Sequence, residues 1–243
     1  MTTTQQQREW FYLQQQRKRR RLAPAPVIEQ RYFTTLTAAG GMYYSLAAPV
    51  TLTGDFEIEF DFYIKSSNPT SNGYRLLGFD GNDLIKIFDK GEFTVGNTVR
   101  LRSGGVNSDA EFDIEIGKFN KLLISRTGSS IYFKINNGVS VLGSAQISTN
   151  VLINKIGQTA STEYLDGIIS NLTIKQSGTL TNSWALDSDG TTGAEIDSVG
   201  GNNATRVNMT AADTELFTLN TAATPDQWES TTSAKVIPIA GTL

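Results

Sequence analysis

Apolar and polar residues alternate along much of the chain, most regularly between residues 55 and 64. In this segment, DFEIEFDFYI, every second position is apolar from Phe56 to Ile64, and acidic residues fill the gaps as far as Asp61. Successive side chains of a β-strand point to opposite faces, so this period of two predicts a strand with one dry and one wet face. Tyr63 falls on the wet face in this prediction.

The stretch EFDIEIGKFNKLLISRTGSSIYFKINNGVSVL (111–142) repeats the pattern three times. Alternating runs at 112–116, 122–124 and 131–135 are separated by turn residues at 117–118 and 127–129. Asn136-Asn137-Gly138 is expected to close a tight hairpin, because Asn and Gly tolerate positive φ angles. The pattern predicts an antiparallel meander with one buried and one solvated face. Other strands are expected at 41–46, 74–79, 84–88, 92–95, 98–102, 121–126, 130–135, 139–142, 152–156, 166–175, 182–186, 204–208 and 215–219.

Four passages resemble the laminin-G-like members of the concanavalin A-like jelly-roll superfamily. GKFNKLLISRTGSSIYFKINNGV (117–139) follows the family's turn, strand, Gly turn, strand and Asn-Gly order, with Phe119 and Asn120 in place of its usual Trp and His. LTGDFEIEFDFYI (52–64) is similar to the family's first long strand, and YLDGIISNLTI (164–174) to its closing strand, with Gly167 at the usual glycine. WALDSDGTTGAEIDSVGGNNATRVN (184–208) resembles a segment of phage and bacterial relatives. The resemblance implies an all-β jelly-roll sandwich of two antiparallel sheets, a fold that hosts lectins, hydrolases and structural modules alike.

The chain is expected to divide into three parts. Residues 1–26 predict a basic helical docking arm, 27–220 the laminin-G-like jelly roll, and 221–243 a C-terminal extension. Gln, Arg and Leu favour a helix that Pro24 and Pro26 end. The resemblance implies that the strands after residue 177 complete the same sandwich. The apolar run 235–239 is expected as an edge strand or as a contact to a neighbouring subunit.

The arm differs from the body in charge. Residues 1–31 carry a net charge of +5, so the remaining residues carry −8 of the total of −3. A basic helix with an apolar cluster is typical of a segment that docks into a protein groove; contact with nucleic acid is the weaker alternative. The residues expected to dock are Trp10, Phe11, Leu13, Arg17, Lys18, Arg19, Arg20 and Arg21.

Composition argues against catalysis, because the chain has 0 His and 0 Cys. It therefore lacks the commonest general base and every thiol nucleophile. One acidic row, Glu111-x-Asp113-x-Glu115, has the spacing of the carboxylates in some glycoside hydrolases of this superfamily. The alternative is an ordinary wet strand face, and a near-copy at residues 57–61 favours it. We therefore expect no enzymatic activity.

The sequence leaves two kinds of ligand as alternatives, calcium and carbohydrate. Asp187 and Asp189, and similarly the run 80–83, place oxygen ligands on turns, as calcium prefers. Asx-rich turns more often serve their own backbone, so no cofactor is expected beyond possible calcium at 187–190. Carbohydrate could stack on aromatic side chains, although core packing is the commoner role of each; the candidates are Tyr43, Tyr44, Tyr74 and Tyr164.

The resemblance and the arm-plus-sandwich plan together predict a non-enzymatic bacteriophage virion protein of the capsid-decoration, head-fibre or tail-fibre type. Its expected partners are other virion proteins, met through the arm in an oligomeric assembly, and possible host surface glycans. Its expected location is the particle surface. We expect no membrane-spanning segment, because no apolar run is long enough, and no secretory signal, because MTTTQQQREW has no apolar core. The alternatives are a glycoside hydrolase and a bacterial adhesin module.

Overall fold

The computed structural model describes residues 28–65, 73–79, 82–88, 97–136, 138–159, 164–188, 193–220, 227–230 and 236–238. For 28–30, 211, 215–220, 227–230 and 236–238 it describes the backbone alone. The expected arm at 1–26, with all of its docking residues, lies outside these ranges, as does the expected strand at 92–95. No helix in the described part of the chain is long and apolar enough to cross a membrane.

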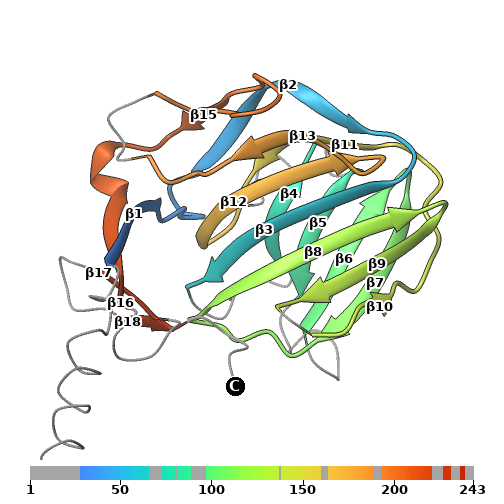
Figure 1. Cartoon of the computed structure of the whole chain (residues 1–243), viewed down its shortest axis with the longest axis horizontal. Coiled ribbons are helices and arrows are strands. Elements are labelled where there is room, and N and C mark those ends of the chain that lie inside the picture. Colours follow the sequence, from blue (N-terminus) through green and yellow to red (C-terminus); the bar gives the residue numbers. More distant parts are fainter. Residues whose placement is uncertain are drawn as a thin grey trace, which may run out of the picture.

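Two antiparallel sheets face each other and form the body of the molecule (Figure 1). The six-stranded sheet has the order β10 (Val141–Leu142), β9 (Ser130–Ile135), β8 (Phe119–Thr127), β3 (Phe56–Ile64), β12 (Gly167–Gln176), β13 (Thr179–Trp184). The eight-stranded sheet has the order β14 (Ala194–Glu195), β15 (Ala204–Val207), β2 (Tyr43–Leu52), β11 (Val151–Ile156), β4 (Tyr74–Gly78), β5 (Leu84–Phe88), β6 (Asn97–Ser103), β7 (Val106–Phe112). The antiparallel strands that the alternation predicts and the all-β sandwich that the resemblance implies are both confirmed.

A third, smaller sheet holds both ends of the described chain. Its order is β1 (Ile28–Thr34), β16 (Thr214–Asn220), β17 (Gln227–Ser230), β18 (Val236–Pro238), and a 3₁₀ turn, η1 (Ala211–Asp213), precedes β16. The strand expected at 215–219 therefore exists as β16, but it lies in this third sheet and not in either layer of the sandwich. Residues 236–238 form its edge strand, which confirms the edge-strand reading of the run 235–239.

The antiparallel register places both chain ends at one end of the small sheet. Ile28 pairs with Asn220, and Gln227 pairs with Pro238 at the same end. The opposite end joins the sandwich, where Leu36 forms a bridge with Gly167. β1 therefore begins and β18 ends at the end of the small sheet opposite this bridge.

The dry faces of the two large sheets share one core. All five apolar residues of the alternating row on β3 are at most 2% exposed, and Trp184 is fully buried. Gly167 is required by this packing, because a Cβ there would collide with the carbonyl oxygen of Tyr63 on β3. This close approach gives a physical reason for a glycine at the position that the family resemblance singled out.

Two local expectations need correction. Strand β7 ends at Phe112, so the run 112–116 is not a strand throughout. At the Asn-Asn-Gly turn, Asn136 has a φ of 52° and the Gly138 N–H donates to the Ile135 carbonyl at 3.0 Å. Pairing nevertheless resumes only at Val141, so the connection is wider than a two-residue hairpin.

Candidate functional site

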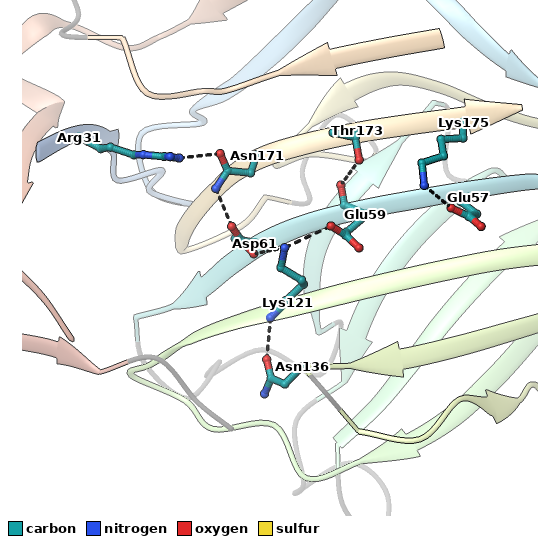
Figure 2. A network of polar contacts seen from close by, with 9 residues as sticks. All are labelled: Arg31, Glu57, Glu59, Asp61, Lys121, Asn136, Asn171, Thr173 and Lys175. Atoms are coloured by element: carbon teal, nitrogen blue, oxygen red, sulfur yellow. Dashed lines mark hydrogen bonds and ion pairs between the residues drawn. The ribbon is translucent and has the colours of Figure 1, made fainter. Parts of the chain in front are cut away.

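The outer face of the six-stranded sheet carries a belt of paired charges (Figure 2). The acids come from the central strand β3 and the bases from its two neighbours, β8 and β12. Glu57 accepts a hydrogen bond from Lys175 at 2.8 Å, and Glu59 accepts one from Lys121 at 3.2 Å. Lys121 also lies 3.7 Å from Asp61. Opposite charges on adjacent strands attract, so the acidic alternation of β3 is balanced across the sheet.

A bulge in β12 extends this belt to the small sheet. Asn171 has a φ of 51° and lies where the pairing of β12 with β3 shifts register. Its amide donates to the Asp61 carboxylate at 2.6 Å, and its side-chain carbonyl accepts from Arg31 of β1 at 2.8 Å. The backbone turn therefore directs one amide toward partners on two different sheets, as Figure 2 shows.

The lysines of the belt are held in their charged form. Burial alone would lower the pKa of Lys121, but the carboxylates of Asp61 and Glu59 outweigh it and raise that pKa. The pKa of Lys175 is also raised, chiefly by its hydrogen bond to Glu57. The side chains of Lys121, Glu59, Lys175 and Glu57 are between 42% and 47% exposed, so these groups remain within reach of a ligand.

The face changes character along the strands. At the end near β1, the rings of Phe33 and Tyr63 lie 5.3 and 5.6 Å from the ring of Phe119, and all three are buried. Tyr63 is therefore covered rather than wet, contrary to the alternation. At the other end, a row of directly paired residues crosses all six strands, and its members are Leu180, Lys175, Glu57, Ser125, Tyr132 and Leu142. We call this row the open row.

A separate buried cluster is formed by Glu195, Arg206 and Ser188. Glu195 of β14 accepts a hydrogen bond from Arg206 of β15 at 2.7 Å and one from the Ser188 hydroxyl at 2.6 Å. The side chains of Arg206 and Glu195 are only 5% and 4% exposed. Burial raises the pKa of the neighbouring Tyr44. The Arg206 guanidinium places a positive charge directly beside the buried Glu195 carboxylate.

The described residues offer few oxygen ligands for the calcium site expected at 187–190. Asp187 is half-buried, and Asp189 lies outside the described residues. The described residues include no group of three or more His, Cys, Asp or Glu side chains that could hold a metal ion.

The segment 184–208, which carries part of the family resemblance, contains a turn that Asp197 stabilises. Asp197 is 4% exposed and its two oxygens accept hydrogen bonds from the amide of Asn182 and from four backbone N–H groups, at 2.7–3.1 Å. Burial would raise the pKa of Asp197, but these bonds lower it below its ordinary value. The Trp184 indole donates to the Asn202 carbonyl at 2.8 Å, and Asn202 in turn bonds the backbone of Ala48, so these polar groups serve the fold.

The acidic row at 111–115 is not one strand face. Glu111 lies on β7, whereas Asp113 and Glu115 follow the end of that strand. All three are exposed, and Glu115 forms an ion pair with Lys118 in the next turn. The described residues therefore do not hold these carboxylates in the buried, facing arrangement that a glycosidase needs.

The tyrosines proposed for sugar stacking divide into two kinds. Tyr44 and Tyr74 are 1% and 2% exposed and belong to the core, so neither can stack on a ligand. Tyr43 and Tyr164 are half-buried, with ring centroids 6.4 Å apart. Tyr132 of the open row was not singled out from the sequence. Its signal was its position between Ile131 and Phe133 in an alternating strand, which places it on the outer face.

Comparison with known proteins identifies the fold. The sequence matches no family model and no curated protein. A solved structure from Bacteroides ovatus, provisionally described as a carbohydrate binding protein, aligns with a TM-score of 0.57 at 15% identity over 75% of this chain and 59% of its own length. This likeness agrees with the expected fold, an all-β jelly-roll sandwich of two antiparallel sheets.

Other solved structures are more distant. Domains LG4-5 of mouse laminin alpha1 align with a TM-score of 0.42 at 16% identity, over 61% of this chain and 41% of that one. The enzymatically active domain of bacteriophage CBA120 tailspike protein 2 aligns with a TM-score of 0.38 at 11% identity, over 63% and 28%. At these TM-scores neither likeness bears on the function of this chain.

Proposed function

We propose that this chain is a non-enzymatic structural protein of a bacteriophage particle that displays a glycan-binding jelly roll on the particle surface. The observation that carries the proposal is the separation of an attachment end from an open polar face. β1 begins and β18 ends at the end of the small sheet opposite its bridge to the sandwich, and the open row lies at the far end of the six-stranded sheet. A displayed module needs this separation, because its tether must not cover its ligand site.

The open row suits a sugar chemically. Carboxylates accept hydrogen bonds and ammonium groups donate them, and a sugar hydroxyl does both. Glu57 and Lys175 present a hydrogen-bond acceptor and a donor side by side. Ser125, next to Glu57 in the open row, has a small side chain that leaves space above the sheet. Tyr132 then offers an aromatic face and a hydroxyl. The fold of the Bacteroides ovatus protein, described as carbohydrate-binding, supports this assignment.

Three features support a binding role without catalysis. The chain contains 0 His. Each carboxylate of the belt lies beside a lysine, with Lys121 shared by two of them, and the carboxylates of Glu195 and Asp197 are bound to fixed partners inside the protein. The 111–115 carboxylates are exposed and spread beyond a strand end. We expect Glu111→Gln and Glu115→Gln to leave folding and particle function unchanged, with no release of reducing ends from β-glucan by any form of the protein.

The virion assignment comes from the sequence. It rests on the similarity of the segment 184–220 to phage and bacterial relatives and on the plan of an arm followed by a sandwich. Strand β1, which follows the arm in the sequence, is held to the sandwich by the hydrogen bond from Arg31 to Asn171 and by the contact between the Phe33 and Phe119 rings.

The test is binding of the full chain to an array of bacterial surface polysaccharides, followed by titration calorimetry with the polysaccharide that gives the strongest signal. Tyr132→Ala should weaken binding about tenfold or more, a loss of about 1.4 kcal/mol. The double variant Glu57→Gln with Lys175→Met should weaken it similarly while leaving the net charge unchanged.

The matched control is Glu115→Gln with Lys118→Met. This variant removes an exposed acid–base pair of the same kind from the turn before β8, away from the open row. It should bind like the wild type. No binding to any bacterial polysaccharide, or equal binding by all variants, would contradict the glycan-binding face.

A further inference from the structure

The open row is an uninterrupted line of side chains across the six-stranded sheet, whose strands lie side by side in Figure 1. Each strand contributes one residue, and each residue is directly paired with the next. Neighbouring strands lie about 4.8 Å apart, so the row is roughly 24 Å long. Leu180 and Leu142 at its two ends are 40% and 59% exposed, and every residue between them is at least partly exposed. A ligand can therefore contact the row along its whole length.

The row lies on the face of a sheet, so it contacts a ligand from one side only. A pocket that holds a single small molecule encloses most of that molecule's surface. One sugar unit on the open row would keep its other face in water, and its few contacts would hardly offset the translational and rotational freedom that binding removes. Consecutive linked units lose that freedom once and add contacts with each unit. The row is therefore suited to a run of sugar units and poorly suited to a single terminal sugar.

The outer face of the six-stranded sheet has no net charge among its described residues. Three acids of β3 are matched by three lysines of the neighbouring strands, and these residues are Glu57, Glu59, Asp61, Lys121, Lys134 and Lys175. An acidic polymer would gain no net attraction from such a surface. Sugar hydroxyls, in contrast, can donate to the carboxylates and accept from the ammonium groups. The face therefore favours uncharged sugar units.

We propose that the open row binds an internal run of an extended, uncharged polysaccharide that lies across the strands, with one sugar unit for each of the six strands. This inference rests on the proposed glycan-binding role of the row and adds the class and direction of the ligand. An extended chain of β-linked six-membered sugar rings advances by about the strand spacing for each ring, so each strand meets one ring. The leucines at the ends suit the C–H faces of the outer rings, whereas the charged pair and Tyr132 contact the rings between them.

Fragments of graded length test whether a run of units is recognised. The polysaccharide with the strongest array signal is partly hydrolysed and size-fractionated, from single sugars to fragments longer than the row. Titration calorimetry with the full chain should show the dissociation constant falling by about tenfold or more between disaccharides and fragments that span all six strands. Longer fragments should bring little further gain. Binding should also change little with salt concentration, because the ligand is uncharged.

Variants at the two ends of the row test the direction of the chain. Leu180→Ser and Leu142→Ser change exposed side chains roughly 24 Å apart, so a ligand weakened by both must cross the strands. Each should weaken the spanning fragments several-fold, and the double variant should show the sum of the two losses in binding free energy. Ile196→Ser is the matched control, because Ile196 is 63% exposed and lies next to Asp197, which bridges Trp184 at the other end of β13. It should bind like the wild type, and every variant should keep the wild-type circular dichroism spectrum.

The inference would be overturned by a single sugar that binds as tightly as the spanning fragments, by end variants of which only one or neither weakens binding, or by a preference for an acidic polymer that high salt abolishes. In each of these cases Tyr132→Ala would still weaken binding if the proposed glycan-binding role is correct. If Tyr132→Ala instead binds every fragment like the wild type, the glycan site itself is refuted, and this inference with it.

Discussion

Replacing Arg206 with Met tests whether the buried ion pair holds the 184–207 region in place. The substitution removes the guanidinium 2.7 Å from the Glu195 carboxylate, in a place where both side chains are at most 5% exposed. Glu195 would keep the Ser188 hydroxyl as its remaining hydrogen-bond partner among the described residues. Breaking a buried pair from one side costs about 3–5 kcal/mol, because it leaves an uncompensated charge out of water. At about 2–4 °C per kcal/mol for a domain of this size, the melting temperature should fall by about 6–20 °C.

The double variant Glu195→Gln with Arg206→Met is the decisive control. It removes both charges, so it should recover most of the lost stability. Urea unfolding of the full chain, followed by circular dichroism, gives the free energies of unfolding. A loss below about 1 kcal/mol for Arg206→Met, or a double variant as unstable as the sum of both single ones, would refute the reasoning.

Three further predictions follow from single side chains. Phe60→Ala should lower the free energy of unfolding by about 3–5 kcal/mol, whereas Glu59→Ala should cost at most about 1 kcal/mol, and equal effects in urea unfolding would mean that the faces of β3 are misassigned. Because the folded-state pKa of Asp197 is lowered, its stabilisation is present above the unfolded pKa of about 3.9 and is lost as pH falls through the folded pKa. Asp197→Asn should therefore flatten the acid dependence of the urea midpoint, and an unchanged dependence would exclude this cause. Trp10→Ala should weaken attachment to particles more than any single Arg→Ala within 17–21, measured by co-sedimentation, since a buried aromatic anchor outweighs one rim charge; the reverse order, with steep salt dependence, would favour a phosphate contact.

The alternation of apolar residues was sufficient to predict most strands. It located β3 with its five core residues, and the expected strands at 84–88 and 130–135 match β5 and β9 residue for residue. Strands β3 and β9 have one partly solvated face over most of their length, so their own sequence indicates which side is buried. Where both faces of a strand are covered, the sequence pattern no longer indicates which face is buried. Tyr63 has the spacing of a solvated residue, yet it is buried against Phe119 at the end of the sheet near β1.

The pattern of apolar residues did not predict which strands pair with each other. The strand at 214–220 looks like its neighbours in sequence, but its partner is β1, about 180 residues away, in a separate sheet. The candidate site was missed for a related reason. Its charges looked like ordinary surface alternation, and Asn171 acquires its role from a bulge that turns its amide toward β1 and β3 together. Such a juxtaposition depends on tertiary structure, and the local sequence carries only the residue types.

The most direct test of the central proposal is immunogold electron microscopy of purified phage particles with an antibody against residues 28–220. The proposal predicts gold on the surface of intact particles, because the sandwich is displayed outward and the terminal segments attach it. Labelling that is absent from intact particles, or that appears only after the particles are disrupted, would contradict the proposal that this protein is a surface-displayed virion component.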